Sequence, residues 1–118
     1  MGRDTPMKMI VAYVKPFKLD AVREALVMAG AEGLTIAEVR GCGRQMGKTE
    51  IYRGAEYEVA LIPKIKIEAV VPASALKGAL AAVQDAAATG RIGDGKIFVL
   101  DVQSAVRIRT GETGLAAL

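Results

Sequence analysis

The stretch Lys64-Ile65-Lys66-Ile67-Glu68-Ala69-Val70-Val71 alternates between two kinds of position. Every second residue from Ile65 to Val71 is apolar, whereas every second residue from Lys64 to Val70 makes up a mixed set of two lysines, a glutamate and a valine. Successive side chains of an extended chain point to opposite faces, so the pattern predicts a strand with one purely apolar face and one mixed face. One side of this strand should pack against a core.

A strand and a helix are predicted upstream of this stretch. Residues 9–14 form a short apolar run that ends at Lys15-Pro16, where proline has no N–H to donate to a sheet. An amphipathic helix should follow, with Asp20 in its first turn and Gly30 as the residue that closes it. Its apolar residues recur at helical spacing: Leu19, Val22, Ala25, Leu26 and Ala29.

A second strand and a second helix flank the alternating stretch. The strand is expected over residues 34–40 and ends at the break Gly41-Cys42-Gly43. Ser74 is the predicted N-cap of the helix and Gly90 its predicted end, while Gly78 inside it costs about 1 kcal/mol relative to alanine. The apolar stripe of this helix consists of Leu76, Leu80, Val83 and Ala87.

Two further β-rich segments, residues 96–102 and 106–109, complete the predicted elements. The order strand, helix, strand then occurs twice, which is typical of an α+β, ferredoxin-like βαββαβ sandwich. In that fold an antiparallel sheet has both helices on one face. Because the strands keep apolar residues on both sides, we expect self-association to cover the other face. The hydrophobic content of 52% supports this expectation.

A long connection separates the second and third strands, from about Gly43 to Ala60. It is polar, punctuated by glycine and without helical periodicity. A structureless loop of that length inside a small domain indicates either a wrong element assignment or a functional loop. We favour a functional loop, because binding residues are often placed on loops that a rigid scaffold holds.

The composition argues against several classes of protein. A chain of 118 residues is the size of one domain, and its most apolar stretch, residues 70–88, is too interrupted for a membrane span. There is one cysteine, Cys42, and no histidine, which argues against disulfides, zinc sites and histidine-based hydrolysis. The first residues lack the apolar core of a secretory signal, so we expect a cytoplasmic protein.

The charge of the chain suggests an anionic ligand or partner but no nucleic acid. The net charge is +3, which is too small to indicate nucleic acid by itself. Four cationic residues nevertheless cluster in one segment: Arg40, Arg44, Lys48 and Arg53. That cluster favours an acidic partner or an anionic ligand.

A glycine-rich turn, Thr89-Gly90-Arg91-Ile92-Gly93-Asp94-Gly95-Lys96, joins the second helix to the fourth strand. Its glycines leave backbone amides free to approach an anion, and Lys96 adds charge. Most of a Walker A spacing is present, but Ile97 stands where Ser or Thr should hold magnesium, so a P-loop is rejected. The alternative is purely structural, with Gly90 as a helix cap and residues 93–95 as a tight turn.

Two arginines follow in the last predicted strand. Arg107 and Arg109 are two residues apart, so on an extended chain both guanidinium groups would project from one face and could straddle adjacent phosphates. Together with Lys96 they would form a triphosphate clamp. The alternative is a solvated edge strand with alternating charge.

The ends of the long loop carry further candidates. Gln45 and Lys64 supply an amide oxygen and a cation that could receive a magnesium-bound oxyacid, although spacing alone supports this weakly. Tyr52 and Tyr57 suggest either contact and modification or partly packed anchors. Cys42 is interpreted as a small packed side chain rather than a reactive thiol.

Taken together, these residues resemble the PII nitrogen-regulatory signal-transduction family, from about Met7 to Ala117. Five blocks carry the resemblance, in the family order: Lys15-Pro16-Phe17-Lys18-Leu19, Gly43-Arg44-Gln45, Tyr52-Arg53-Gly54-Ala55-Glu56-Tyr57, Thr89-Gly90-Arg91-Ile92-Gly93-Asp94-Gly95-Lys96-Ile97-Phe98 and Arg107-Ile108-Arg109-Thr110-Gly111-Glu112. The resemblance implies a regulatory protein rather than an enzyme. It also implies a homotrimer with ATP or ADP bound in the clefts between subunits.

The resemblance also implies roles for single residues. The phosphates would be held by Arg44, Gly93, Asp94, Gly95, Lys96, Arg107 and Arg109, and the base and its surroundings by Thr35, Glu68 and Val70. Gln45 would ligate Mg²⁺ together with ATP and 2-oxoglutarate. Lys64 would pair with the distal carboxylate of 2-oxoglutarate, and Gly47 and Gly93 would complete that site. Because the metal requires the third phosphate, ADP should not support 2-oxoglutarate binding.

In the family, the loop over residues 43–60, called the T-loop, carries the signal to partners. The implied partners are an ammonium transporter, which would recruit the protein reversibly to the membrane, and a uridylyltransferase, an adenylyltransferase or a sensor kinase. Arg53 resembles the residue that enters the transporter pore, and Tyr57 the tyrosine that is uridylylated, with Tyr52 as second choice. Ala55 stands where some members carry a phosphorylated serine.

Departures from the family pattern are few. Cys42 replaces a usual aromatic residue, and Met46 and Lys48 replace commoner loop residues. Residues 1–6 precede the usual start and are either a genuine extension or a cloning remnant, so the domain is expected over residues 7–118.

The sequence argues against two other classes of protein. An RNA-binding ferredoxin-like domain would present an aromatic platform on its central strands, which the two phenylalanines and three tyrosines are not expected to form. A nucleotide-hydrolysing or nucleotide-transferring enzyme would need a positioned base or nucleophile near the phosphates, and the sequence shows none.

Overall fold

An antiparallel sheet with strand order β2-β3-β1-β4 forms the centre of the molecule. The computed structural model describes residues 6–42 and 61–118. Its strands and helices, in chain order, are β1 Met7–Val14, α1 Leu19–Met28, β2 Thr35–Gly41, β3 Ile62–Pro72, α2 Leu76–Ala87 and β4 Gly95–Asp101. Single turns of 3-10 helix precede α1 (η1, Pro16–Lys18) and α2 (η3, Ala73–Ala75), and another follows near the end (η4, Gly114–Ala117).

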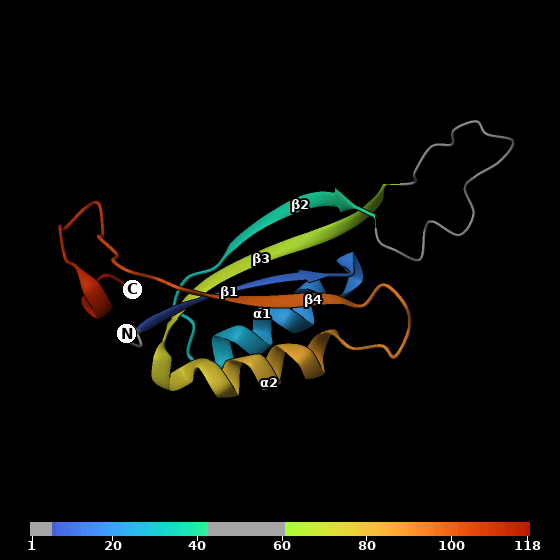
Figure 1. Ribbon diagram of the computed structural model, residues 1–118, viewed down its shortest axis with the longest axis horizontal. Coiled ribbons are helices and arrows are strands. Elements are labelled where there is room, and N and C mark those ends of the chain that lie inside the picture. Colours follow the sequence, from blue (N-terminus) through green and yellow to red (C-terminus); the bar gives the residue numbers. More distant parts are fainter. Residues whose placement is uncertain (1–5, 43–60) are drawn as a thin grey trace, which may run out of the picture.

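Both helices cover the same face of the sheet (Figure 1). The core lies between the two layers, where Ile10 and Ile67 of the sheet meet Leu26 of α1 and Val83 of α2, each with no exposed surface. Fully burying one such side chain stabilises the fold by roughly 1.5–3 kcal/mol. The predicted α+β sandwich with both helices on one face is therefore confirmed.

The predicted helix after the first strand is also confirmed. Helix α1 buries Val22 and Leu26, has Asp20 in its first turn, and is followed by Gly30 at a φ of 109°. A positive φ costs glycine little, which is why this residue can turn the chain back towards β2. In the described part of the chain, no helix has the length and hydrophobicity needed to cross a bilayer.

Two predicted ends of α2 are wrong. Ser74 lies inside the turn η3 and is not the N-cap, because Ala75 occupies that position and no side chain caps the helix. At the other end, the helix already stops at Ala88, whose backbone is extended, so Gly90 is not the closing residue. The chain leaves the helix there because the side chain of Asp94 binds the backbone N–H groups that follow it.

The predicted strand at residues 106–109 is also wrong. Val106 makes only an isolated bridge to Thr113, and residues 108–110 form a turn. The N–H of Arg107 donates to the carbonyl of Glu112, while the hydroxyl of Thr110 donates to the Glu112 carboxylate at 2.9 Å. Such local side-chain hydrogen bonds compete with strand formation, and here they favour a tight hairpin.

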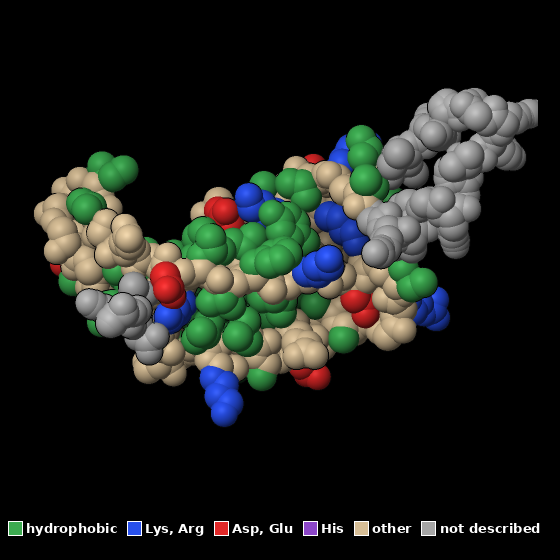
Figure 2. Space-filling model, viewed as in Figure 1, with side chains coloured by type: hydrophobic (Ala, Val, Ile, Leu, Met, Phe, Trp, Pro, Cys, Tyr) green, Lys and Arg blue, Asp and Glu red, His purple; other side chains and the backbone are tan. Residues whose placement is uncertain are grey.

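The sheet face away from the helices is largely apolar. Met9, Val11 and Val70 alternate with the buried core positions and therefore point to this face, as do Phe98 and Leu100 of β4. Phe98 is 50% exposed and Leu100 46% exposed. Figure 2 shows hydrophobic side chains gathered over the sheet. The predicted strand with apolar residues on both sides is thus confirmed, and its second face is open in a single chain.

At the end of the sheet, the last residue of β1 pairs with both neighbouring strands. Val14 pairs with Ile65 of β3 on one side and with Gly95 of β4 on the other. Gly95 has a φ of 109°, and a Cβ added to it would lie 1.7 Å from the carbonyl oxygen of Tyr13. Only glycine permits so close an approach of the two backbones.

We predict that Gly95→Ala lowers the free energy of unfolding by at least about 2 kcal/mol, because the new Cβ forces β4 away from β1 at an unfavourable φ. Urea unfolding at one fixed protein concentration measures the effect. Gly78→Ala in α2 is the matched control, since a Cβ there meets no atom within 4 Å, and it should raise stability by up to about 1 kcal/mol. Equal stability of Gly95→Ala and wild type would contradict the argument.

Candidate functional site

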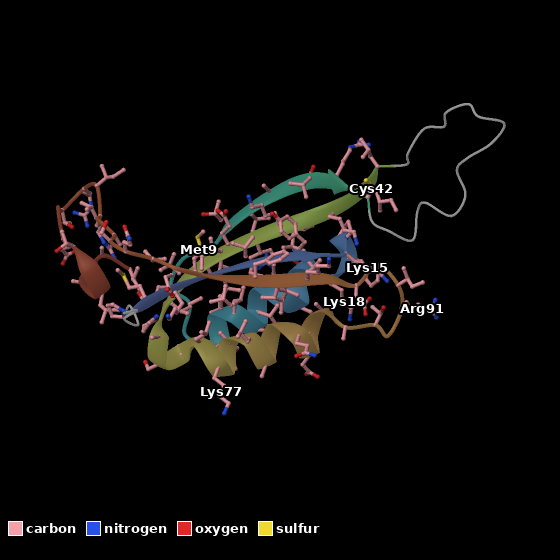
Figure 3. All side chains as sticks on the ribbon, in the orientation of Figure 1. Met9, Lys15, Lys18, Cys42, Lys77 and Arg91 are labelled. Carbon is pink, nitrogen blue, oxygen red and sulfur yellow. The ribbon has the colours of Figure 1, made fainter. Side chains whose placement is uncertain are left out.

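A cleft of about 1050 Å³ lies at the end of the sheet where β1 ends and β3 and β4 begin. Its walls come from the end of β1 with η1, from the facing ends of β2 and β3, and from the turn between α2 and β4. Figure 3 shows Lys15, Cys42 and Arg91 at this same end of the molecule, on different segments. The cleft is therefore built from residues far apart in the sequence.

The cleft is strongly cationic. Six of its lining residues are basic: Lys15, Arg40, Lys64, Lys66, Arg91 and Lys96. Asp94 is the single acidic residue among the described residues that line it. A concave surface lined by one sign of charge concentrates ligands of the opposite sign. The geometry thus favours a small molecule with several negative charges.

The carboxylate of Asp94 organises the turn before β4. It accepts hydrogen bonds from the backbone N–H groups of Thr89 at 2.7 Å and Gly90 at 2.9 Å. It also accepts the Thr89 hydroxyl and forms an ion pair with Lys15 at 3.2 Å. Its oxygens are thus directed towards the start of its own turn. The turn leads into a strand, β4, and not into a helix as a P-loop does. This confirms the rejection of a P-loop.

These partners stabilise the charged form of Asp94. The hydrogen bonds from the Thr89 hydroxyl and the Thr89 N–H, helped by Lys15 and the Gly90 N–H, hold the pKa of this carboxyl well below its usual range, although partial burial opposes them. Asp94 is therefore ionised under all physiological conditions, and it offsets part of the positive charge of the cleft.

Lys64 holds the other side of the same turn. Its ammonium group donates to the carbonyl oxygen of Gly93 at 2.5 Å. A Cβ added to Gly93 would lie 3.6 Å from Cε of Lys15 and 3.7 Å from Nζ of Lys64, so the two lysines flank this glycine. The turn is thus tied to both β1 and β3, next to the mouth of the cleft.

The structure brings together one part of the predicted site. Five predicted residues line the cleft: Lys64, Gly93, Asp94, Gly95 and Lys96. Thr35 pairs with Glu68, and both lie with Val70 on the open face of the sheet, further from the cleft. Glu68 is linked to the cleft by an ion pair with Lys66 at 3.4 Å. These residues therefore share one continuous surface.

The predicted clamp of Lys96 with Arg107 and Arg109 does not form within one chain. Lys96 stands at the start of β4, and the arginines follow its other end, Asp101. A strand of this length spans roughly 20 Å. Figure 1 shows the C-terminal segment at the end of the sheet opposite the turn. Arg107 donates instead to the carbonyl oxygen of Leu118 at 2.6 Å.

Other predicted residues lie outside the described part of the chain: Arg44, Gln45, Gly47, Tyr52, Arg53, Ala55 and Tyr57. Cys42, by contrast, is exposed and lines the cleft, so it is not the packed side chain that was expected.

The described residues contain no group of three acidic, cysteine or histidine side chains that could hold a metal ion.

Sequence reasoning missed several lining residues. Lys66 could have been found, since it shares a strand face with Lys64 two residues away. Arg40 belongs to the cationic cluster that the sequence showed, and it lines the cleft as that cluster suggested. Lys15 and Arg91 gave no comparable signal, because they come from separate segments whose pairing the sequence does not display. The wall also contains Tyr13.

Two of the aromatic residues that line the cleft, Tyr13 and Phe98, contact each other. Tyr13 and Phe98 lie together with ring centroids 6.2 Å apart and planes at 77°, an edge-to-face pair. An RNA-binding sheet would instead offer ring faces to the bases.

We predict that Asp94→Asn is less stable than wild type at pH 7 and that the difference shrinks below about pH 4, the ordinary aspartate range. The sign follows from the lowered pKa of Asp94: its stabilising effect is present above the pKa of the unfolded chain and is lost as the pH falls towards its folded value. Urea unfolding at several pH values measures this.

Asp101→Asn is the matched control for Asp94→Asn. It removes only an exposed ion pair with Lys8 at the other end of β4, and it should change stability by less than about 1 kcal/mol. A deficit of Asp94→Asn that stays constant down to pH 3 would contradict the assignment.

Comparison with known proteins extends these observations. The family model described as "Nitrogen regulatory protein P-II" matches residues 7–112. Nitrogen regulatory protein P-II of Mesorhizobium japonicum is 59% identical over 112 residues, which cover 95% of this chain and 100% of the relative. The protein of the same name from Rhizobium meliloti is 55% identical over 112 residues, with the same coverage.

Two solved structures share the fold. The crystal structure of Arabidopsis thaliana PII bound to citrate is 34% identical, with a TM-score of 0.79 over 98% of this chain and 94% of that one. The structure of B. subtilis GlnK is also 34% identical, with a TM-score of 0.81 over 97% of this chain and 100% of that one. The predicted family and its regulatory, non-enzymatic character are confirmed, and the chain belongs to the nitrogen regulatory protein P-II family.

Proposed function

We propose that this protein senses nitrogen, carbon and energy status by binding ATP or ADP and, with Mg-ATP, 2-oxoglutarate. It passes the result to partner proteins through the T-loop, residues 43–60. The observation that carries the proposal is the cationic cleft, in which the turn before β4, Lys64 and Lys96 converge. Its volume, about 1050 Å³, is at the upper end of ordinary ligand pockets and leaves room for a nucleotide beside a small dicarboxylate.

The phosphates are assigned to the turn. Gly93 and Gly95 allow the backbone to approach them closely, and Lys96 adds a cation, while Arg44 completes this half of the site. Asp94 takes part through its backbone, because its carboxylate is already bound within the turn. Thr35, Glu68 and Val70 are assigned to the base and its surroundings, along the same sheet face.

Arg107 and Arg109 are assigned to the nucleotide bound by a neighbouring copy. Within one chain they lie beyond the far end of β4 from Lys96. They can reach a phosphate only if a second copy places its C-terminal segment at the cleft. This separation supports a site that two subunits share.

The homotrimer is proposed on the basis of the open sheet face. That face carries Phe98 and Leu100 at about half of their full exposure, whereas charged residues are gathered at the cleft end. Monomeric proteins rarely leave such a contiguous apolar patch open to water. Three copies that share this face would bury it and would bring each C-terminal segment towards a neighbour.

The effector 2-oxoglutarate is assigned to Gln45, Gly47, Lys64 and Gly93, with Mg²⁺ held by Gln45 and the two ligands. In the structure, Lys64 donates to a neutral carbonyl, that of Gly93. A carboxylate at this place would give Lys64 a stronger, charge-assisted partner. The citrate named for the Arabidopsis relative is another polycarboxylate, which supports a carboxylate site in this fold.

The T-loop is assigned to partner contact. Arg53 would enter an ammonium transporter, which would bring this otherwise cytoplasmic protein reversibly to the membrane. Tyr57 would be the target of a uridylyltransferase, and an adenylyltransferase or a sensor kinase would read the result. A nucleotidyl group adds bulk and negative charge, which should prevent tight docking.

We predict that Lys64→Ala binds ATP with nearly wild-type affinity but loses 2-oxoglutarate binding by at least about tenfold, because the carboxylate loses its charged partner. Calorimetry with Mg-ATP, followed by 2-oxoglutarate, measures both. Lys77→Ala on α2, far from the cleft (Figure 3), is the matched control and should behave as wild type. Unchanged effector affinity of Lys64→Ala would remove this site assignment.

The trimer proposal predicts a mass of three 12.4 kDa chains in light scattering. Phe98→Glu should dissociate the assembly, since it places a charge in the apolar contact. Met28→Glu is the matched control: Met28 is exposed on α1, on the helix side of the molecule, and its replacement should leave the mass unchanged. A monomeric wild type at micromolar concentration would rule the trimer out.

The modification proposal predicts that a PII uridylyltransferase with UTP labels wild type and Tyr52→Phe but not Tyr57→Phe. The label is measured by mass spectrometry of the intact chain. Equal labelling of all three proteins would move the modified residue elsewhere.

A further inference from the structure

Thr89 and Lys15 have no ligand role in the proposed site, yet both bind Asp94, the acidic side chain among the described residues of the cleft. Thr89 donates to the Asp94 carboxylate twice, through its N–H at 2.7 Å and through its hydroxyl. Its hydroxyl oxygen also accepts the N–H of Arg91 at 3.2 Å. Lys15 reaches the same carboxylate at 3.2 Å and the Thr89 hydroxyl at 3.3 Å. These groups of Thr89, Asp94, Arg91 and Lys15 form one connected network.

This network joins the two ends of the turn. Thr89 follows Ala88, the C-cap of α2, whereas Asp94 immediately precedes β4. Lys15 adds a link to the sheet, because it follows the last residue of β1, Val14. The turn is therefore closed upon itself and linked to an inner strand of the sheet by the protein's own groups.

We propose that Thr89, together with Lys15 and Asp94, is a positioning residue that holds the turn in the conformation that binds phosphate. We call these three residues the brace. The inference rests on the proposed nucleotide site and adds residues to it that touch no phosphate themselves.

The physical reason lies in the glycines of the turn. Gly90, Gly93 and Gly95 all adopt positive φ values, and glycine has many other conformations of similar energy. A turn that moved among them would have to be ordered at the moment of binding, at a cost in affinity. With the brace, the turn is already ordered when the chain has folded, and no further conformational entropy is lost on binding. Loss of the brace should therefore weaken phosphate binding in particular.

The brace also resolves an electrostatic conflict. A free carboxylate beside the phosphates would repel them, but that of Asp94 is turned towards two N–H groups, a hydroxyl and an ammonium group. Lys15 has only part of its side chain exposed, about 19%, so its charge acts chiefly on this partner. Asp94 can thus shape the turn without opposing the ligand.

The test compares Thr89→Val, which keeps the shape but loses the hydroxyl, with Thr89→Ser, which keeps the hydroxyl. Calorimetry measures ATP, ADP and adenosine binding to each, and circular dichroism checks folding. We expect Thr89→Val to bind ATP and ADP about tenfold more weakly and adenosine unchanged. Thr89→Ser should restore wild-type affinity, and Asp101→Asn, the other aspartate near β4, should match wild type.

A second readout needs no ligand. In Thr89→Val, the backbone amides of Gly90 and Arg91 should exchange their hydrogens faster than in wild type, while those of α2 should not change. ATP affinity equal to wild type in Thr89→Val, or an equal loss for adenosine, would overturn the brace. A wild type that binds no nucleotide would instead overturn the proposed function, and unchanged amide exchange in Thr89→Val would then overturn the brace independently.

Discussion

The pairing of Val14 with two partners is the constraint on which the site depends. Val14 stands opposite Ile65 on one side and opposite Gly95 on the other. The chain neighbours of these residues, Lys15, Lys64 and Asp94, are thereby brought to one edge of the sheet. Because the register of a buried sheet cannot slip by one residue without turning its core side chains to the wrong face, packing of the core also fixes the geometry of the cleft.

The charges of the cleft are only partly balanced by the protein. Lys15 is paired with Asp94 and Lys66 with Glu68. Within the described residues, Arg40, Arg91 and Lys96 form no ion pair with an acidic side chain. Gathering like charges costs stability, and an anionic ligand would relieve that cost. Like charges that lie close together at a cost in stability are characteristic of binding sites.

The two faces of the sheet have separate tasks. One face packs against α1 and α2 and supplies the stability of the chain. The other carries apolar residues such as Phe98 along its length and cations at one end. Because successive side chains alternate between faces, one strand can serve both tasks, and β3 does so most clearly, with Ile65 in the core and Lys64 at the cleft.

The amino-acid pattern by itself determined the order and kind of the elements, since periodicity directly reflects which side of an element is buried. It located β3, α1 and β4 to within a few residues, and it singled out Lys64 and the turn around Gly93 through glycine and charge. It missed the hairpin at Thr110, where local hydrogen bonds outweigh average propensity, and it misplaced both ends of α2.

Only the tertiary structure decided which charged residues meet. Lys15 joins Asp94, and Arg107 stays away from Lys96, because strand register and strand length set the distances between segments. A sequence shows the chemistry of each residue and its position along the chain, but contacts between distant segments arise from the packing of the whole core.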